Sequence, residues 1–293
     1  MPKLAWIGLG VMGSPMARHL KAKGCDQIAV FNRTRAKADA WAAANGGAAA
    51  ATPAEAARDA AFVFSCVGND DDLREVTIGA DGAFATMAAG GVFVDHTTTS
   101  AVVVRELAEE ARKRGLAFLD CPVSGGQAGA ESGQLTVMAG GDEAAFAAAK
   151  PYVDRYAKAA TLIGPSGAGQ LTKMANQIAV AGVVQGLAEA IQFAERSGLD
   201  VAAVIGAISK GAAQSWQMEN RWKTMAARSF DFGFAVDWMR KDLGICLDET
   251  KRNGASLPVT QVIDRFYADV QALGGGRYDT SSLIVRFDQR KLS

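Results

Sequence analysis

A stripe of polar side chains follows one long and otherwise apolar segment in the second half of the chain. Gln170, Lys173, Asn176 and Gln177 are spaced so that they share one face of a helix predicted over 167–196. We expect this helix to be buried on most sides because the residues around the stripe are apolar. Burial would depress the pKa of a lysine there and suit it to proton transfer near neutral pH. The alternative is a lysine whose ammonium group reaches solvent from the first helical turns.

A second set of polar groups follows a strand predicted at 116–119. The segment reads DCPVSGG over residues 120–126, at what should be the carboxyl edge of a sheet, where open α/β sheets bind ligands. Ser124 offers a hydroxyl, and Gly125 and Gly126 offer backbone N–H groups that no side chain obstructs. Such a loop is suited to hold a small carboxylate.

A glycine-rich turn joins the first predicted strand, at 4–7, to a helix predicted over 11–23. The turn consists of Gly8, Leu9, Gly10, Val11, Met12 and Gly13. In this strand–turn–helix context the G-x-G-x-x-G spacing is typical of dinucleotide binding, because the glycines allow a tight turn and a close approach to a pyrophosphate. The free N–H groups at the helix N-terminus then favour the phosphates. A purely structural turn is the alternative.

The end of the second predicted strand, at 27–31, indicates which dinucleotide binds. Sites that prefer NAD carry a carboxylate there, about twenty residues after the turn, to bind the ribose hydroxyls. This chain has Asn32, Arg33 and Thr34 instead, with Lys37 one helical turn beyond. These basic and hydroxyl groups can bind a 2′-phosphate, so we predict NADP in preference to NAD. Solvated charges at the start of a helix are the alternative.

The composition excludes several other kinds of chemistry. Among 293 residues there are two histidines, His19 and His96, so His-rich zinc sites and most Ser-His-Asp schemes lack their parts. The four cysteines are far apart and form no C-x-x-C motif, which favours reduced thiols. The acidic run at 70–72 is interpreted as a solvated helix N-terminus, and we expect no metal site.

Charge and hydropathy give expectations about partners and location. Lys and Arg together number 31, as do Asp and Glu, and no dense basic block occurs, so we do not expect nucleic acid as a partner. The sequence opens MPKLAWIGLG without a basic-then-apolar leader. No apolar run reaches the roughly 18 to 20 residues of a membrane span. We expect a soluble cytoplasmic protein that does not bind a membrane.

Predicted strands and helices alternate up to residue 163 and are followed by helices. The further strands are expected at 61–66, 91–95, 135–139 and 160–163. The further helices are expected at 35–45, after an N-cap at Thr52, and at 101–114, 201–208, 214–225, 234–253 and 259–272. This order predicts an α/β fold with a Rossmann-type, doubly wound and mostly parallel sheet, followed by an all-α domain. We place a dinucleotide-binding domain at 1–164 and a helical substrate and oligomerisation domain at 165–293.

Taken together, these segments resemble the β-hydroxyacid dehydrogenases, the family of 3-hydroxyisobutyrate dehydrogenase and the glyoxylate and succinic semialdehyde reductases. The resemblance covers essentially the whole chain. It rests on GLGVMGSPM at 8–16, DHTTTSA at 95–101, DCPVSGG at 120–126, GAGQLTKMAN at 167–176 and MRKDL at 239–243. Five such motifs in the family's order are far more specific than any one of them.

The resemblance implies a role for each matched residue near the substrate. Lys173 would be the general acid/base, and Asn176 would hold the substrate or orient the lysine. The loop of Ser124, Gly125 and Gly126 would bind the substrate carboxylate. The family often has a second Asn after Asn176, where this chain has Gln177, so the size of the substrate stays open.

The resemblance also implies contacts with the cofactor. Thr98 would lie against the nicotinamide half, and Lys241 would close over cofactor and substrate from the helical domain. Val67 and Gly68 would form a cofactor loop, in which many members carry proline at the position of Gly68. The segment from Asn32 to Thr34 is similar to that of the NADP-dependent reductases of the family.

These observations predict an NADP(H)-dependent oxidoreductase that moves hydride between the nicotinamide and a short β-hydroxy acid or its semialdehyde. An imine reductase on the same fold and a non-catalytic dinucleotide sensor are the alternatives. The family resemblance implies a homodimer or homotetramer. The substrate pocket is expected near four aromatic residues that could equally be core: Trp216, Phe232, Phe234 and Trp238.

Overall fold

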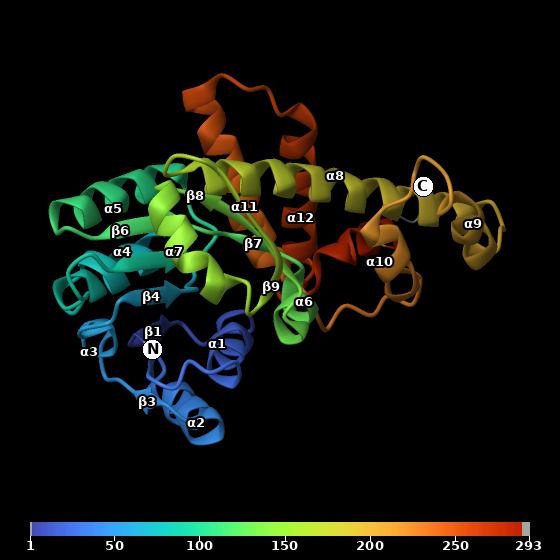
Figure 1. Ribbon diagram of the computed structural model, residues 1–293. Helices are drawn as coiled ribbons and strands as arrows, with labels where there is room; N and C mark the ends of the chain where they lie inside the picture. Colours follow the sequence, from blue (N-terminus) through green and yellow to red (C-terminus); the bar gives the residue numbers. More distant parts are fainter. Residues whose placement is uncertain (1, 289–293) are drawn as a thin grey trace. The chain divides into compact units, whose positions relative to one another are not determined.

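The strands of the described chain lie between residues 4 and 164 and form one sheet (Figure 1). The computed structural model describes residues 2–288. The strands are β1 (Leu4–Ile7), β2 (Ile28–Phe31), β3 (Ala48–Ala49), β4 (Phe62–Ser65), β5 (Val92–Asp95), β6 (Ala117–Asp120), β7 (Val123–Ser124), β8 (Leu135–Gly140) and β9 (Ala157–Gly164).

Helices alternate with these strands and continue after them. Those between strands are α1 (Gly13–Ala22), α2 (Arg35–Asn45), α3 (Pro53–Ala57), α4 (Asp70–Ile78), the 3-10 turn η1 (Ala83–Ala85), α5 (Ala101–Lys113), α6 (Gly126–Ser132) and α7 (Glu143–Val153). Those after β9 are α8 (Ala168–Arg196), α9 (Val201–Ile208), α10 (Trp216–Ala226), α11 (Val236–Asn253), α12 (Pro258–Ala272), η2 (Thr280–Ile284) and α13 (Val285–Asp288).

The order of the strands confirms the predicted fold class. Strands β3-β2-β1-β4-β5-β6 lie side by side and run parallel, which is the doubly wound order of dinucleotide-binding folds. The sheet continues through β8, which runs antiparallel to β6 and β7, and β9 pairs parallel to β8. The carboxyl ends of β1, β2, β4, β5 and β6 therefore meet along one edge, where ligands bind in such sheets.

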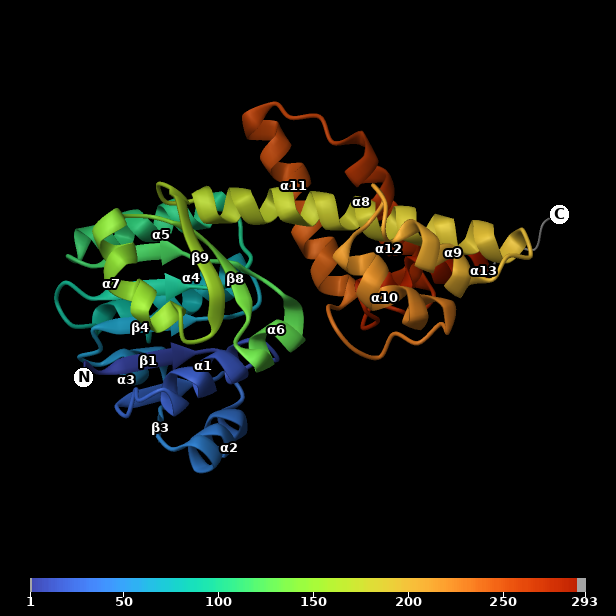
Figure 2. The ribbon, with the colours of Figure 1, turned by 45° about the vertical axis from the view of Figure 1, so that its right-hand side comes forward.

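Helices cover both faces of the sheet (Figure 2). Leu4 and Trp6 of β1 pack into a core shared with α1, α2 and α7. Ala5 and Ile7 point the other way, into a core shared with α3, α4 and α5. All four residues are buried, which explains why the parallel strands read as nearly continuous apolar runs.

The chain divides into two compact units inside α8, and the domain boundary at residue 164 stays a prediction. The first unit is Met1–Lys173 and the second is Met174–Ser293. The first turns of α8 belong with the sheet because Asp120, at the end of β6, accepts hydrogen bonds from the N–H groups of Gly167 and Gln170.

Helix α8 carries the core of the second unit on one face. Ala181, Val184 and Ile191 are buried there together with residues of α11 and α12. Val183 and Phe193 are 39% and 70% exposed, so the expectation that the helix is buried on most sides is wrong for a single chain. In the described part of the chain, α8 is the one helix long and apolar enough to cross a membrane, and 44% of its most apolar stretch is buried.

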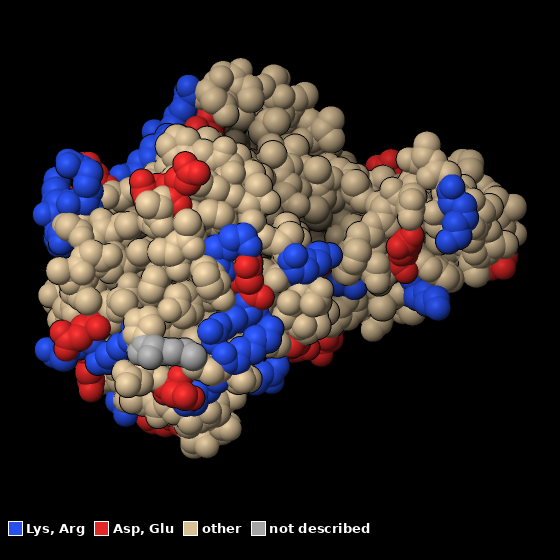
Figure 3. Space-filling view, viewed as in Figure 1, with Lys and Arg blue, Asp and Glu red and all other residues tan. Residues whose placement is uncertain are grey.

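Charges of both signs are interspersed over the surface. On the face shown in Figure 3, Lys and Arg side chains and Asp and Glu side chains are scattered among uncharged residues. This distribution agrees with the equal numbers of basic and acidic residues in the sequence.

Candidate functional site

Three buried polar residues end adjacent strands at the carboxyl edge of the sheet. Ser65 of β4, Asp95 of β5 and Asp120 of β6 lie in register and are fully buried. The Ser65 hydroxyl donates a hydrogen bond of 2.6 Å to Oδ1 of Asp95. Asp95 and Asp120 are the first residues of two of the matched motifs, but the sequence assigned neither of them nor Ser65 a role, because their alignment depends on strand pairing.

Asp95 holds the two loops that the sequence assigned to the cofactor. Its Oδ1 accepts hydrogen bonds from the backbone N–H and hydroxyl of Thr97, at 3.2 and 2.6 Å. The Thr97 hydroxyl in turn accepts one from the N–H of Val67, at 3.0 Å. One carboxylate therefore positions the loop of Val67 and Gly68 relative to the loop that carries the half-buried Thr98.

Asp120 fixes the N-terminus of α8 to the same edge. Its two carboxylate oxygens accept hydrogen bonds from the N–H groups of Gly167 and Gln170, at 2.8 and 2.9 Å. Burial raises the pKa of Asp120 to about 6, although these N–H groups favour the charged form and lower it. The helix lies so close to the end of β6 that a Cβ at Gly169 would be 2.4 Å from the carbonyl oxygen of Asp120, and only glycine fits there.

Gln170 joins this helical turn to the loop that contains Thr98. Its side chain is fully buried; Nε2 donates to the carbonyl oxygen of Thr97 at 2.7 Å, and Oε1 accepts from the N–H of Thr99 at 3.1 Å. Lys173 follows three residues later on the same helix and is 8% exposed. The predicted burial of Lys173 is therefore confirmed, and the alternative, a lysine whose ammonium group reaches solvent, is not supported.

The glycine-rich turn is shaped by two side chains from the sheet. Oδ1 of Asn32 accepts a hydrogen bond from the N–H of Leu9, and Nε1 of Trp6 donates to the carbonyl oxygen of Gly8, both at 2.9 Å. Nδ2 of Asn32 donates to the carbonyl oxygen of Thr34. Asn32 thus joins the glycine-rich turn to the segment after β2 that carries Arg33 and Thr34.

The residues expected to bind a 2′-phosphate lie on the surface just beyond β2. Arg33, Thr34 and Lys37 are exposed, and Nη1 of Arg33 donates to Oδ1 of Asp72 at 2.9 Å. Asp72 belongs to the acidic run, which forms the first turn of α4 after the N-cap Asn69, as predicted.

No group of His, Cys, Asp and Glu within residues 2–288 could hold a metal ion.

Other residues of the turn differ in exposure. Leu9 and Gly13 are buried and Met12 is half-buried, whereas Gly10 is exposed and Val11 is 63% exposed. A Cβ placed on Gly10 would meet no protein atom within 4 Å. The turn therefore leaves open space at the N-terminus of α1, where the N–H groups favour an anion.

The loop after β6 presents backbone groups to solvent. Ser124 is half-buried, and Gly125 and Gly126 are exposed with φ of +127° and +61°, conformations that favour glycine. Helix α6 begins here, and its last carbonyl groups lie 3.0–3.1 Å from Nε2 of His19 on α1. The loop is thus tied to the helix that opens at the glycine-rich turn.

In the second unit, a line of polar side chains begins at Asn176. Nδ2 of Asn176 donates to Oε1 of Gln177 at 2.8 Å, and Nε2 of Gln177 donates to Oδ2 of Asp242 at 2.7 Å. Nζ of Lys241 lies 3.2 Å from Oδ1 of Asp242. The sequence assigned no role to Asp242, although this residue stands in the matched MRKDL segment. Asp242 is buried and contacts Gln177 and Lys241, so we add it to the candidate site residues of the second unit.

Of the four aromatic residues considered for the substrate pocket, Phe234 packs against the core of the second unit. Trp216 and Trp238 are 54% and 41% exposed, and Phe232 and Phe234 are half-buried. The guanidinium of Arg221 lies over the rings of Trp216 and Phe232, at 4.8 and 5.1 Å from their centres.

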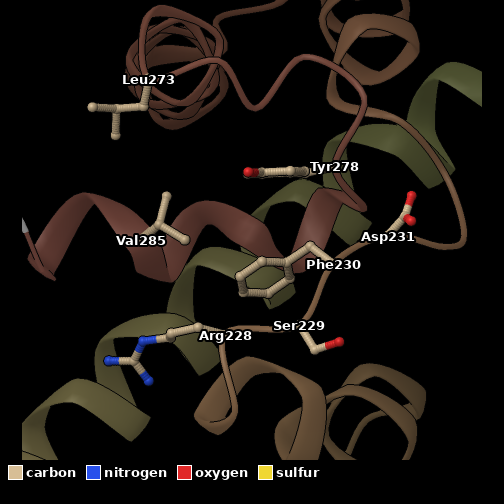
Figure 4. A pocket seen from close by; sticks show the side chains of 7 residues that line it. All are labelled: Arg228, Ser229, Phe230, Asp231, Leu273, Tyr278 and Val285. Atoms are coloured by element: carbon tan, nitrogen blue, oxygen red, sulfur yellow. The ribbon is translucent and has the colours of Figure 1, made fainter.

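A pocket of about 440 Å³ in the second unit is separate from these residues (Figure 4). The rings of Phe230 and Tyr278 line it, with their centres 6.1 Å apart. Arg228, at its edge, is paired with Glu195 and Asp288, so its charge is already compensated. None of the residues predicted for the site lines this pocket.

Replacing Asp95 by asparagine is expected to change how folding stability depends on pH. Burial raises the pKa of Asp95 to about 7, against hydrogen bonds from Ser65 and Thr97 that lower it. Between about pH 4 and 7 the folded chain keeps a proton that the unfolded chain has lost, so the free energy of unfolding falls as the pH rises. Across this pH window we expect the free energy of unfolding of the wild type to fall by roughly 3 kcal/mol relative to that of Asp95→Asn.

His96 acts in the opposite direction and is present in both proteins. Burial lowers its pKa to about 4, so its contribution to stability is lost as the pH falls from about 6.5. Urea denaturation of wild type and Asp95→Asn at a series of pH values removes this shared contribution by difference. A gap between the two proteins that stays constant from about pH 4 to 8 would contradict a protonated Asp95.

Two family models match the chain. The model described as the NAD binding domain of 6-phosphogluconate dehydrogenase matches residues 3–164. The model described as the NAD-binding domain of NADP-dependent 3-hydroxyisobutyrate dehydrogenase matches residues 167–287.

Individual proteins match over nearly the whole chain. An uncharacterised oxidoreductase of Shewanella frigidimarina (strain NCIMB 400) is 59% identical over 99% of this chain and 100% of its own. The 2-hydroxy-3-oxopropionate reductase of Escherichia coli (strain K12) is 34% identical over 96% of both chains. The 3-hydroxyisobutyrate dehydrogenase of Mycobacterium tuberculosis, solved with L-serine, has a TM-score of 0.89 at 30% identity and covers 98% of this chain and 99% of its own.

An imine reductase from Myxococcus stipitatus shares the fold more distantly. Its TM-score is 0.66 at 17% identity, over 99% of this chain and 100% of that one. This likeness concerns the fold alone.

Proposed function

This chain belongs to the β-hydroxyacid dehydrogenase family of NAD(P)-dependent oxidoreductases, and from that premise we propose a reaction for it. The reaction is hydride transfer between NADP(H) and a short β-hydroxy acid or the corresponding aldehyde acid, with Lys173 as the general acid/base. One observation carries the proposal: Lys173 is buried on a helical turn that Asp120 and Gln170 fix to the carboxyl edge of the sheet.

The residues of the first unit fit a dinucleotide. Gly10 leaves open space at the N-terminus of α1, and no acidic residue occupies the first turn of that helix. The loops at Val67 and Thr98 are held in place by Asp95 and Gln170. When bound, the nicotinamide supplies or accepts the hydride.

Lys173 moves the proton that balances the hydride. During reduction, Nζ donates a proton to the carbonyl oxygen of the aldehyde; during oxidation, it accepts the proton of the hydroxyl group. Its placement depends on Gln170, which bonds the backbone on both sides of Thr98. The same turn therefore fixes the lysine relative to the loop assigned to the nicotinamide half of the cofactor.

The substrate carboxylate is assigned to the loop of Ser124, Gly125 and Gly126. A hydroxyl and exposed backbone N–H groups are suited to bind a carboxylate. Both glycines have positive φ, a backbone conformation that residues with a Cβ rarely adopt. Asn176 is oriented by Gln177, so its amide oxygen is available to bind a hydroxyl or to hold Lys173. The similarity to 2-hydroxy-3-oxopropionate reductase and 3-hydroxyisobutyrate dehydrogenase supports a short β-hydroxy acid or aldehyde acid as the substrate.

An activity panel tests the reaction class. The wild-type protein is mixed with NADPH and aldehyde acids of two to four carbons, with NADP⁺ and the matching hydroxy acids, and with NADPH and a cyclic imine. Turnover of an aldehyde acid and of its hydroxy acid is the expected result. Turnover of the imine alone would identify an imine reductase, and tight NADPH binding without any turnover would identify a sensor; both outcomes contradict the proposal.

Arg33→Ala tests the preference for NADP. Loss of a guanidinium that binds the 2′-phosphate should raise the Kd for NADPH by about ten- to a hundredfold and change the Kd for NADH by less than about threefold. Nucleotide fluorescence titration measures both constants without substrate. Arg35→Ala is the matched control, since Arg35 is also exposed but pairs with Asp39 within α2. Equal losses for both nucleotides, or no loss, would contradict the assignment.

A further inference from the structure

The guanidinium expected to bind the 2′-phosphate is already paired with a carboxylate from another element. Nη1 of Arg33 lies 2.9 Å from Oδ1 of Asp72, with 86% of the arginine side chain and 28% of the aspartate side chain exposed. Asp72 stands in the first turn of α4, where its own N–H donates to Oδ1 of Asn69 at 2.8 Å. The less exposed partner of the pair is therefore anchored at a helix N-terminus.

This carboxylate contacts the side chain of the residue that follows the position where NAD-dependent sites carry their acidic residue. That residue normally ends the second strand and accepts hydrogen bonds from the ribose hydroxyls. Here the corresponding place after β2 holds Asn32, whose amide is used by Leu9 and Thr34. Asp72 brings a carboxylate next to the following residue, Arg33, from a part of the chain 39 residues away.

We propose that Asp72 is a specificity-determining residue that weakens the preference for NADP and retains binding of NAD. The proposal rests on the proposed use of Arg33 for the 2′-phosphate. Phosphate and carboxylate are both anions that bind a guanidinium, so a 2′-phosphate must share Arg33 with Asp72 or displace it. A ribose that carries a free 2′-hydroxyl meets no such repulsion and can donate a hydrogen bond to the carboxylate.

The sign of the effect follows from the charges. The guanidinium side of the ion pair is exposed, and ion pairs that reach solvent contribute little, so a phosphate can displace the carboxylate from Arg33. The displaced carboxylate still stands within a few ångströms of an anion, where like charges repel. Removal of the negative charge should therefore strengthen NADPH binding, which is the opposite of the usual effect of a substitution in a binding site.

Asp72→Asn tests the proposal by binding rather than by activity. We expect the Kd for NADPH to fall by roughly three- to tenfold and the Kd for NADH to rise by roughly twofold or more, as measured by fluorescence titration without substrate. The gain for NADPH should shrink at high salt because the charges are exposed. It should also disappear in the Arg33→Ala background if Asp72 acts through the guanidinium.

Asp71→Asn is the matched control. Asp71 lies in the same helical turn and loses the same charge, but its side chain is 94% exposed and pairs with Arg74 instead. We expect both dissociation constants to stay within about twofold of the wild type in this variant. An equal response of the two variants would overturn the proposal in favour of a general effect of net charge. Melting temperatures of both variants check that α4 still folds.

Three further outcomes separate this proposal from the preference for NADP itself. If Asp72→Asn weakens NADPH binding, Asp72 orients Arg33 and the proposal is overturned while the role of Arg33 stands. If Arg33→Ala leaves the ratio of the two constants unchanged, the preference for NADP fails first, and Asp72 has no guanidinium to compete for. If Arg33→Ala acts as expected and Asp72→Asn is silent, only the present proposal fails.

Discussion

Lys173→Met is expected to lower kcat for NADPH-dependent reduction of an aldehyde acid by about a thousandfold or more. Methionine keeps an unbranched side chain at a position that is 8% exposed, so the packing of α8 should survive while the proton donor is lost. The Kd for NADPH should stay within about twofold of the wild type, because the role proposed for the lysine is at the substrate oxygen and not at the cofactor. Stopped-flow measurement of NADPH consumption and fluorescence titration give the two quantities.

Lys210→Met controls for the loss of one positive charge. Lys210 is exposed and lies two residues after the end of α9, outside every residue set assigned to the site, so its replacement should leave kcat unchanged. A kcat for Lys173→Met within tenfold of the wild type would remove the lysine from the proton-transfer step. A loss of NADPH binding equal to the loss of kcat would instead show a structural role for Lys173.

Gly13→Ala is expected to destabilise the protein and abolish cofactor binding together. A Cβ at this position would lie 2.0 Å from the carbonyl oxygen of Gly8, which already accepts a hydrogen bond from the Trp6 indole. Because Gly13 is buried, the turn must open to admit the methyl group. We expect a loss of about 1–3 kcal/mol in the free energy of unfolding and a Kd for NADPH raised by more than about a hundredfold.

Gly10→Ala should separate binding from folding. A Cβ there meets no protein atom within 4 Å, so the free energy of unfolding should change by less than about 0.5 kcal/mol. The added methyl group occupies the space through which the backbone approaches the pyrophosphate, so the Kd for NADPH should rise by about tenfold or more. Denaturant melts and fluorescence titrations of both variants test this contrast. A Gly10→Ala variant that binds NADPH like the wild type would place the phosphates elsewhere.

The features that the sequence predicted best are local ones. The strand–turn–helix at Gly8–Gly13 and the polar face of α8 depend on spacing within one or two elements, and the structure reproduces both. The sequence analysis did not predict helix α7, although Asp142 caps it. Its segment is rich in alanine, so the two faces of the helix differ little in hydropathy. The antiparallel pairing of β8 was also missed, since strand direction in a sheet does not follow from apolar runs.

The parts of the site that were missed depend on contacts between distant segments. Gln170 bonds Thr97 across 73 residues, and Gln177 bonds Asp242 across 65. Such pairs carry no signal in spacing, because each residue alone reads as an ordinary polar side chain. Asp72 was interpreted as a solvated helix start, which it is, but its pairing with Arg33 follows from the order of β1, β2 and β4 in the sheet.

An aldehyde acid and an uncharged aldehyde of the same length should differ sharply as substrates of this protein. Wild-type protein and NADPH are mixed with succinic semialdehyde or with butanal, and kcat/KM is measured for each. A carboxylate bound by Ser124 and the N–H groups of Gly125 and Gly126 should make kcat/KM for the acid about a hundredfold or more higher, as expected for a charge-assisted set of hydrogen bonds. Equal values for the two aldehydes, or turnover of butanal alone, would contradict the assignment of this chain to hydroxy acid chemistry.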